Sequence, residues 1–175
     1  MWRVVPDSER PMKVGVPMKF SLQVSLACTV SEAFAALHDP TVFQRVSAPF
    51  LSFTPLSPAA FPERYVSGHS YVVKVAALGL VPLGSQEINP TSEEEGTARI
   101  FRDNGRGLSG SLAMVSTFRH TMTLRPSSPG LTILTDELEF KAGVLTPLMG
   151  LGFLVFWWWR HRRMAQLAPQ WRSGR

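Results

Sequence analysis

The sequence predicts an α+β domain in which a run of antiparallel strands precedes one long C-terminal helix. Residues 20–28 and 112–140 alternate apolar with polar residues, the period of two that is typical of strands with one buried face. Residues 142–159 contain no charged residue, which favours an apolar helix. The 175 residues, 45% hydrophobic and 18% charged, fit one globular domain.

The chain divides into three parts by pattern and charge. Residues 1–17 sustain no apolar period, so we expect a disordered N-terminal extension. We expect residues 18–168 to form the domain and 169–175 to form a basic C-terminal tail. The net charge of +5 comes from residues 140–175, which hold six Lys or Arg and no acid. Neither a groove-reading helix nor a basic face with interleaved aromatics is visible, so nucleic acid is not an expected partner.

The first strand leads into two short helices. Its apolar positions run from Phe20 to Cys28, which places Cys28 on the buried face. Ser31 is the expected N-cap of a helix over residues 32–38. Asp39 followed by Pro40 has the cap and first-turn residues of a second short helix.

In the middle of the chain, the sequence predicts further strands separated by turns and loops. Residues 54–64 contain three prolines and are expected to form a loop. Residues 104–111 are glycine-rich but lack the spacing of a phosphate-binding loop. The expected strands are residues 71–77, about 84–88, and 98–103, with the acidic run 93–96 as a turn.

Residues 112–141 predict a long hairpin. Centring its turn near Ser128 brings the mainly apolar faces together. This register sets His120 opposite Asp136 on the inner face and Arg119 opposite Glu137 on the outer face.

The last element predicts a helix of about 22 residues. Thr146 and Pro147 are its start signals and Pro169 is its stop signal. The uncharged helical part, 147–159, rises roughly 20 Å against a hydrocarbon core of about 30 Å, which is too short for a span. The following Trp157–Trp159 and arginine cluster suits a membrane interface, so peripheral membrane contact stays open as an alternative.

The order of these elements resembles the START/SRPBCC superfamily, in its polyketide cyclase and ligand-binding-like branch. The resemblance covers residues 18–167, and Met122 stands where that branch often has a second histidine. The matching stretches are AFAALHDPTVFQRVSAPF, with Phe34, His38, Asp39, Pro40 and Pro49; STFRHTMTL, with Phe118 and His120; Thr135–Asp136 with Glu139–Phe140; and WWWRHRR.

The resemblance implies the helix-grip fold, a curved antiparallel sheet wrapped around the C-terminal helix with a cavity between them. Such a cavity suits a lipid, a quinone or a polyketide-like molecule. The alternative is that the same residues simply fill a core. The expected ligand-binding residues are Leu112, Met114, Phe118, His120, Met122, Leu134, Asp136, Leu138 and Phe140 from the hairpin, and Leu151, Val155 and Trp158 from the helix.

The only titratable pair that stands out is His120 with Asp136. A carboxylate beside an imidazole can orient the ring, anchor a ligand oxygen or transfer a proton. We expect an anchoring or structural role, hence a carrier or sensor of a hydrophobic molecule. The alternative is an enzyme of the polyketide cyclase or aromatase type that uses both residues catalytically.

No metal or other cofactor is expected. The four histidines are dispersed, with His161 among arginines and expected to face water. A single cysteine, Cys28, cannot form an internal disulfide, which favours a reducing, cytoplasmic location. The identity of the ligand and the oligomeric state do not follow from the sequence.

Overall fold

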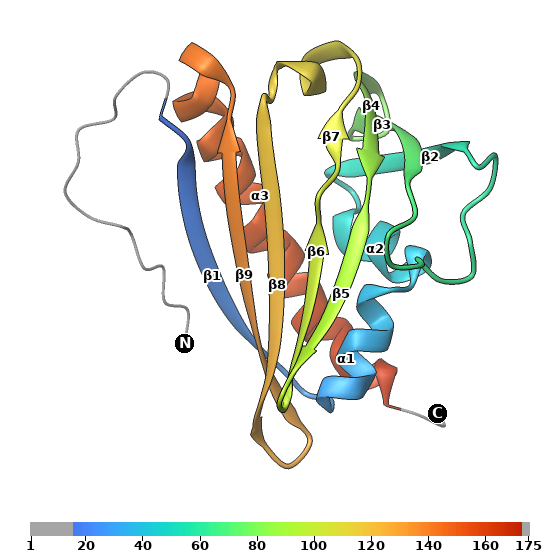
Figure 1. The fold of residues 1–175 in the computed structure, drawn as a ribbon, viewed down its shortest axis with the longest axis vertical. Coiled ribbons are helices and arrows are strands. Elements are labelled where there is room, and N and C mark those ends of the chain that lie inside the picture. Colours follow the sequence, from blue (N-terminus) through green and yellow to red (C-terminus); the bar gives the residue numbers. More distant parts are fainter. Residues whose placement is uncertain (1–15, 173–175) are drawn as a thin grey trace.

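Two antiparallel sheets and one long helix make up the fold in the computed structural model, which describes residues 16–172 (Figure 1). The helices are α1 (Val30–Leu37), α2 (Pro40–Ser47) and α3 (Thr146–Leu167). The strands are β1 (Met18–Leu26), β2 (Leu51–Ser57), β3 (Tyr71–Ala77), β4 (Val81–Ile88), β5 (Pro90–Glu95), β6 (Ala98–Asp103), β7 (Arg106–Gly107), β8 (Thr117–Ser128) and β9 (Leu131–Lys141). This order confirms the predicted α+β class. The expected N-terminal extension lies, up to residue 15, outside the described residues.

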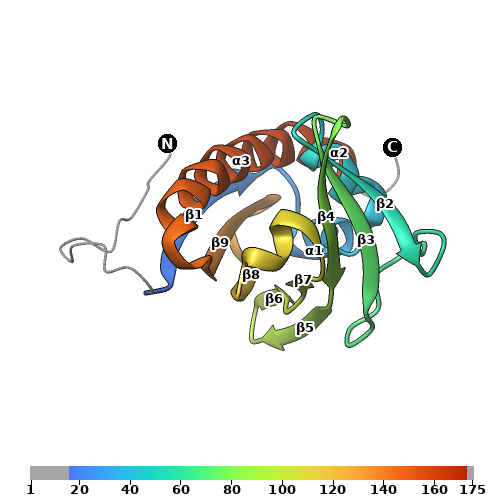
Figure 2. The same cartoon turned by 90° about the horizontal axis from the view of Figure 1, so that it is seen from above.

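The chain passes directly from one sheet to the other at Asn89. The larger sheet has the order β1-β9-β8-β6-β5 and the smaller β2-β3-β4-β7. Because β4 ends at Ile88 and β5 begins at Pro90, only Asn89 separates the two sheets along the chain. Seen from above, the strands form a curved wall that faces α3 (Figure 2).

The two short helices follow their local sequence signals, with one correction. Thr29, not Ser31, caps α1: its hydroxyl accepts from the backbone N–H of Glu32, and the Glu32 carboxylate accepts from Thr29 N at 2.8 Å. This reciprocal box needs an acid three residues after the cap, a condition that Thr29 meets and Ser31 does not. Asp39 caps α2 as predicted, accepting from Thr41 N at 2.7 Å.

Two segments predicted as loop or turn are strands in part, over residues 54–57 and 93–95. Strand β2 extends through Pro55, and it tolerates proline because it lies at a sheet edge and pairs only with β3. The acidic run lies in β5, where Glu94 and Glu93 form ion pairs with Arg99 and Arg102 of β6 at 3.1 and 2.7 Å. The turn comes afterwards, at Gly96, whose φ of 58° favours glycine.

The β8–β9 hairpin forms with a register two residues away from the predicted one. His120 is paired with Leu138, and Asp136 with Met122. A bulge between Pro126 and Ser128 moves the turn beyond Ser128, to the segment that contains Gly130 with a φ of 71°. Since side chains alternate with a period of two, this shift leaves the residues that pair in this register on their predicted faces.

Helix α3 packs against the larger sheet. Fully buried Leu134 and Leu138 of β9 belong to two hydrophobic clusters that include Met164 and Trp157 of the helix. A 3-10 turn over Ala168–Trp171 continues α3, and Arg172 donates to Ala27 O at 3.0 Å. The expected tail is thus packed against the domain as far as Arg172. Among residues 16–172, no helix is long and apolar enough to cross a membrane.

Candidate ligand cavity and its polar cluster

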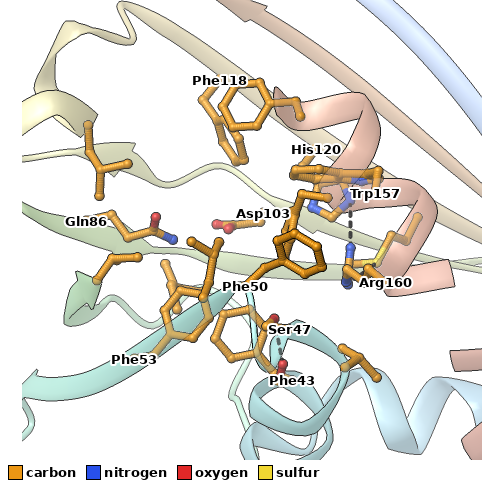
Figure 3. Close-up of a pocket in the computed structure, with 18 of the residues that line it drawn as sticks. Phe43, Ser47, Phe50, Phe53, Gln86, Asp103, Phe118, His120, Trp157 and Arg160 are labelled. Atoms are coloured by element: carbon orange, nitrogen blue, oxygen red, sulfur yellow. Dashed lines mark hydrogen bonds between the residues drawn. The ribbon is translucent and has the colours of Figure 1, made fainter. Parts of the chain in front are cut away.

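A cavity of about 400 Å³ lies between α3, α2 and the two sheets (Figure 3). Its wall is mainly apolar, with polar groups at Ser47, Tyr65, Gln86, Asp103, Ser111, His120 and Arg160. The apolar residues that line it include Val42, Phe43, Val46, Phe50, Leu51, Phe53, Val75, Leu83, Ile88, Leu112, Phe118, Met122, Met149, Phe153, Phe156 and Met164.

Four of the hairpin residues expected to bind ligand line the cavity, namely Leu112, Phe118, His120 and Met122. Met114 does not, because the segment before β8 forms a 3-10 turn (Gly110–Met114) instead of continuing the strand, and this leaves Met114 49% exposed. The expected residues of β9 also lie outside the wall. Leu134, Asp136, Leu138 and Phe140 are fully buried in the layer between the sheet and α3.

The helix presents a different face to the cavity from the one predicted. Leu151, Val155 and Trp158 are 63%, 48% and 46% exposed on the outer face. Residues 147–159 are apolar on all sides, so hydrophobicity alone could not indicate which face packs inward. The side chains that do line the cavity from α3 are Met149, Phe153, Phe156, Trp157, Arg160 and Met164.

The smaller sheet and α2 supply the part of the wall that sequence reasoning missed. Phe43, Phe53 and Val75 come from α2, β2 and β3. The signal was present in the alternation of residues 71–77, which predicts inward-facing valines. Because these residues are far from the hairpin in sequence, the pattern did not indicate that both regions line one cavity.

Asp136 is the centre of a buried polar cluster. Its Oδ1 accepts from His120 Nε2 at 2.5 Å and from Trp157 Nε1 at 3.0 Å. Its Oδ2 accepts from Arg160 Nη1 at 3.2 Å and from His161 Nε2 at 3.0 Å. His161 is fully buried, contrary to the expectation that it faces water, because α3 turns this position toward the sheet while Arg162 faces solvent.

The cluster holds Asp136 as a carboxylate. Burial alone would raise the pKa of Asp136, but the hydrogen bonds and charges of His120, His161 and Arg160 bring that pKa well below its ordinary value. Burial lowers the pKa of Arg160, and the neighbouring Asp136 opposes this shift. The buried charges therefore compensate one another.

Of this cluster, His120, Trp157 and Arg160 line the cavity, whereas Asp136 and His161 do not. Because Nε2 of His120 donates to Asp136, its Nδ1 is the ring nitrogen left for a guest. Arg160 Nη1 lies 3.4 Å from His120 Nε2, and Arg160 Nη2 contacts Met122 Sδ at 3.1 Å (Figure 3). The arrangement can orient the imidazole toward the cavity.

A second polar group lines the cavity where the chain changes sheets. The Oδ1 atom of Asp103 accepts from the backbone N–H groups of Asn89 and Gly105, both at 2.9 Å. Burial raises the pKa of Asp103. Gly105 is required here because a Cβ would lie 1.9 Å from Glu87 O, closer than any side chain can approach.

The remaining candidate residues lie apart from the cavity. Burial raises the pKa of the Cys28 thiol to about 11, which is typical of an unreactive core cysteine. His38 bonds Phe34 O and Ser92 Oγ at the end of α1. Across the described part of the chain, no group of three or more His, Cys, Asp or Glu could hold a metal ion.

Comparison with known proteins places the fold. No family model and no curated protein matches the sequence. An X-ray structure of a protein from Chromobacterium violaceum is 16% identical, with 86% of this chain and 96% of that chain covered and a TM-score of 0.63. A solution structure of a protein from Arthrobacter aurescens is 14% identical and has a TM-score of 0.64. The match covers 87% of this chain and 86% of that chain. Norcoclaurine synthase from Thalictrum flavum, in complex with dopamine and hydroxybenzaldehyde, is 9% identical and has a TM-score of 0.59. The match covers 95% of this chain and 100% of that chain. Together with the order of its elements, these likenesses show that the chain has the helix-grip fold.

Proposed function

We propose that this protein binds a hydrophobic small molecule in the cavity between α3 and the two sheets. The observation that carries the proposal is the volume of about 400 Å³ with a mainly apolar wall. Ligand pockets commonly measure about 300 to 1,000 Å³ and are lined in this way. The similarly folded norcoclaurine synthase, whose structure contains dopamine and hydroxybenzaldehyde, supports a small aromatic guest.

The entrance to the cavity lies between α3 and the 3-10 turn before β8. Gly152 of α3 and Ser111 of that turn both line the cavity and are exposed to solvent, as expected of residues at its rim. A Cβ built on Gly152 meets no atom within 4 Å, so a larger side chain fits there without disturbing the helix. Gly152 is therefore the position at which the entrance can be blocked.

Titration with the apolar fluorophore N-phenyl-1-naphthylamine tests this function. We expect saturable binding with one molecule per chain in the unchanged protein and in G152A. G152W places an indole at the rim and should lower the affinity at least about tenfold, since the probe must displace it. Fluorescence that rises without saturation, or to the same extent in G152W, would contradict the proposal.

Acid–base catalysis at His120 is the second candidate function. It is favoured by one observation: the ring lines the cavity while Asp136 holds its Nε2 from behind. The effect of H120A distinguishes a His120 that anchors a ligand from a His120 that catalyses a reaction. An anchor would lose affinity for a hydroxyl-bearing probe such as 2-naphthol, whereas an enzyme of the polyketide cyclase or aromatase type would keep the affinity and lose turnover.

Peripheral membrane contact stays a candidate, but of the expected cluster only Trp158 and Arg162 belong to the surface that the structure offers for it. Trp157 is buried and the Trp159 indole donates to Ala48 O at 2.8 Å, so the tryptophan cluster does not share one surface. The outer face of α3 instead carries an exposed apolar stripe that ends at Arg162, whose guanidinium lies 5.8 Å from the Trp158 ring. The stripe consists of Leu148, Leu151, Val155 and Trp158 of α3, with exposed Val144 in the 3-10 turn that precedes the helix.

An anionic membrane is the partner that this stripe fits, since residues 140–175 contain six basic residues and no acid. Flotation with vesicles of phosphatidylcholine and phosphatidylglycerol tests it. The L151E/W158E double variant should lose vesicle binding. L80E is the matched control, because Leu80 is 84% exposed on the β3–β4 turn and not on α3. Flotation that survives the double substitution would rule this contact out.

A further inference from the structure

We propose that the guest of the cavity carries a neutral hydroxyl group, which donates a hydrogen bond to Oδ2 of Asp103. This inference rests on the proposed function and specifies the chemistry of its ligand. It concerns the carboxyl group at the end of β6, which makes no hydrogen bond with the Asp136 cluster, although Asp103 is paired with His120 across β6 and β8.

The two oxygens of Asp103 have different surroundings. Oδ1 is occupied by the backbone N–H groups of Asn89 and Gly105, which fix the orientation of the carboxyl group. Within residues 16–172, no hydrogen bond or ion pair reaches Oδ2. In Figure 3 the carboxyl group extends into the cavity toward Gln86. The structure thus holds an acceptor in place and leaves it to be satisfied from the cavity.

An apolar cavity makes this acceptor costly to leave unpaired. Asp103 is the only acidic residue among those that line the cavity, and most of its neighbours there are apolar. The hydroxyl of Ser47, also on the wall, already donates to Phe43 O at 2.8 Å. Burial raises the pKa of Asp103, which means that the charged form lacks part of the stabilisation it has in water. A hydrogen bond donated by a guest would restore that stabilisation.

The apolar wall favours a neutral donor over an ammonium group. Arg160 and His120 lie near enough to Asp103 to act on its carboxyl group electrostatically. Arg160 is itself a cation that lines the same cavity. A cationic guest would have to give up its hydration in this apolar cavity, and Arg160 offsets part of its attraction to Asp103, whereas an alcohol or phenol meets neither cost.

Two probes of the same shape separate donor recognition from hydrophobic binding. 2-Naphthol donates through its hydroxyl group, and 2-methoxynaphthalene presents the same rings and oxygen without a donor. We expect the unchanged protein at neutral pH to bind 2-naphthol about tenfold more tightly in calorimetric titration, the difference typical of one buried hydrogen bond. The cationic 2-naphthylmethylammonium should bind more weakly than 2-naphthol.

D103N provides the matching change in the protein. The two backbone N–H groups require an acceptor, so the amide oxygen of the variant takes the place of Oδ1 and its NH2 group faces the cavity. The hydroxyl donor of 2-naphthol then faces the NH2 donor of the variant side chain. The preference for 2-naphthol over 2-methoxynaphthalene should therefore disappear. E87Q is the control, because Glu87 is the neighbouring carboxylate on β4 but pairs with Arg106 and Ser70 outside the cavity.

The possible results distinguish failure of this inference from failure of the proposed function. Equal affinity for the two naphthalene probes in the unchanged protein overturns the hydroxyl inference and leaves hydrophobic binding intact. Binding of neither probe overturns both. The comparison in the unchanged protein decides the question even if D103N folds poorly. Where D103N folds, a preference that persists in it also overturns the assignment to Asp103.

Discussion

His120 and Asp136 form a 2.5 Å hydrogen bond although they are not paired across the β8–β9 hairpin. They lie on one face of the sheet and are diagonal neighbours, since His120 is paired with Leu138 and Asp136 with Met122. The cross-strand diagonal is within reach of an imidazole. Helix α3 then closes this contact by adding Arg160 and His161 to Asp136. The hydrogen bond therefore ties the strand layer to the helix.

D136N should destabilise the fold strongly. The change removes the negative charge that compensates buried Arg160 and weakens four hydrogen bonds at once. Losing one partner of a buried ion pair typically costs about 3 to 5 kcal/mol. Urea unfolding measures this cost. E137Q, on the exposed neighbouring position, should change the free energy of unfolding by less than about 0.5 kcal/mol. A D136N cost as small as that of E137Q would contradict the structural role of the cluster.

The contribution of Asp136 should depend on pH with a defined sign. Its pKa is about 3.8 when unperturbed and well below that value in the folded chain. A depressed folded pKa means that the stabilisation is complete above the unfolded pKa and is lost as the pH falls through the folded one. The difference in unfolding free energy between the unchanged protein and D136N should be constant near neutral pH and shrink in acid below 3.8. A difference that grows in acid would show that the carboxylate is not stabilised by the fold.

Two glycines should respond to alanine in opposite directions. G152A adds a methyl group in open space on α3 and should stabilise the fold by up to about 1 kcal/mol, the helix propensity difference. G105A places a Cβ against Glu87 O and should destabilise it by about 1 to 3 kcal/mol, the usual range for overpacking. Thermal unfolding of both variants measures the pair. Equal shifts of Tm would contradict the tight approach at Gly105.

The Cys28 thiol should be inert in the folded protein. It is fully buried, and its pKa is raised to about 11, so little thiolate forms and reagents cannot reach it. Modification by 5,5′-dithiobis(2-nitrobenzoic acid) at neutral pH should be at least about a hundredfold slower than in urea, because it requires opening of the core. Rapid modification without denaturant would mean that the interior near β1 and α1 is accessible.

The sequence predicted the strands and helices better than the faces they present. Alternation placed His120 and Asp136 on one face, and an even register shift could not change this. The sequence could not indicate which face of α3 packs inward, because residues 147–159 are apolar on all sides. Its orientation depends on Trp157, Arg160 and His161 binding Asp136, a contact between distant parts of the chain.

The cavity wall illustrates the same limit. Leu112, Phe118, His120 and Met122 were expected to contact a guest and line the cavity, and whether they bind one is still a prediction. Asp103 was missed because its sequence signal is that of a strand end before a glycine-rich loop. Its position in the wall depends on the crossing between sheets at Asn89, which no local pattern reveals.

Methyl NMR with a bound probe tests the central claim most directly. With 13C-labelled methionine methyl groups, N-phenyl-1-naphthylamine bound in the cavity should give intermolecular NOEs to Met122, Met149 and Met164, which line the wall. Met18 and Met114 lie outside the wall and should give none. NOEs confined to Met114 and Met18, or absent from all five methyl groups at saturating probe, would show that no guest occupies the space between α3 and the sheets.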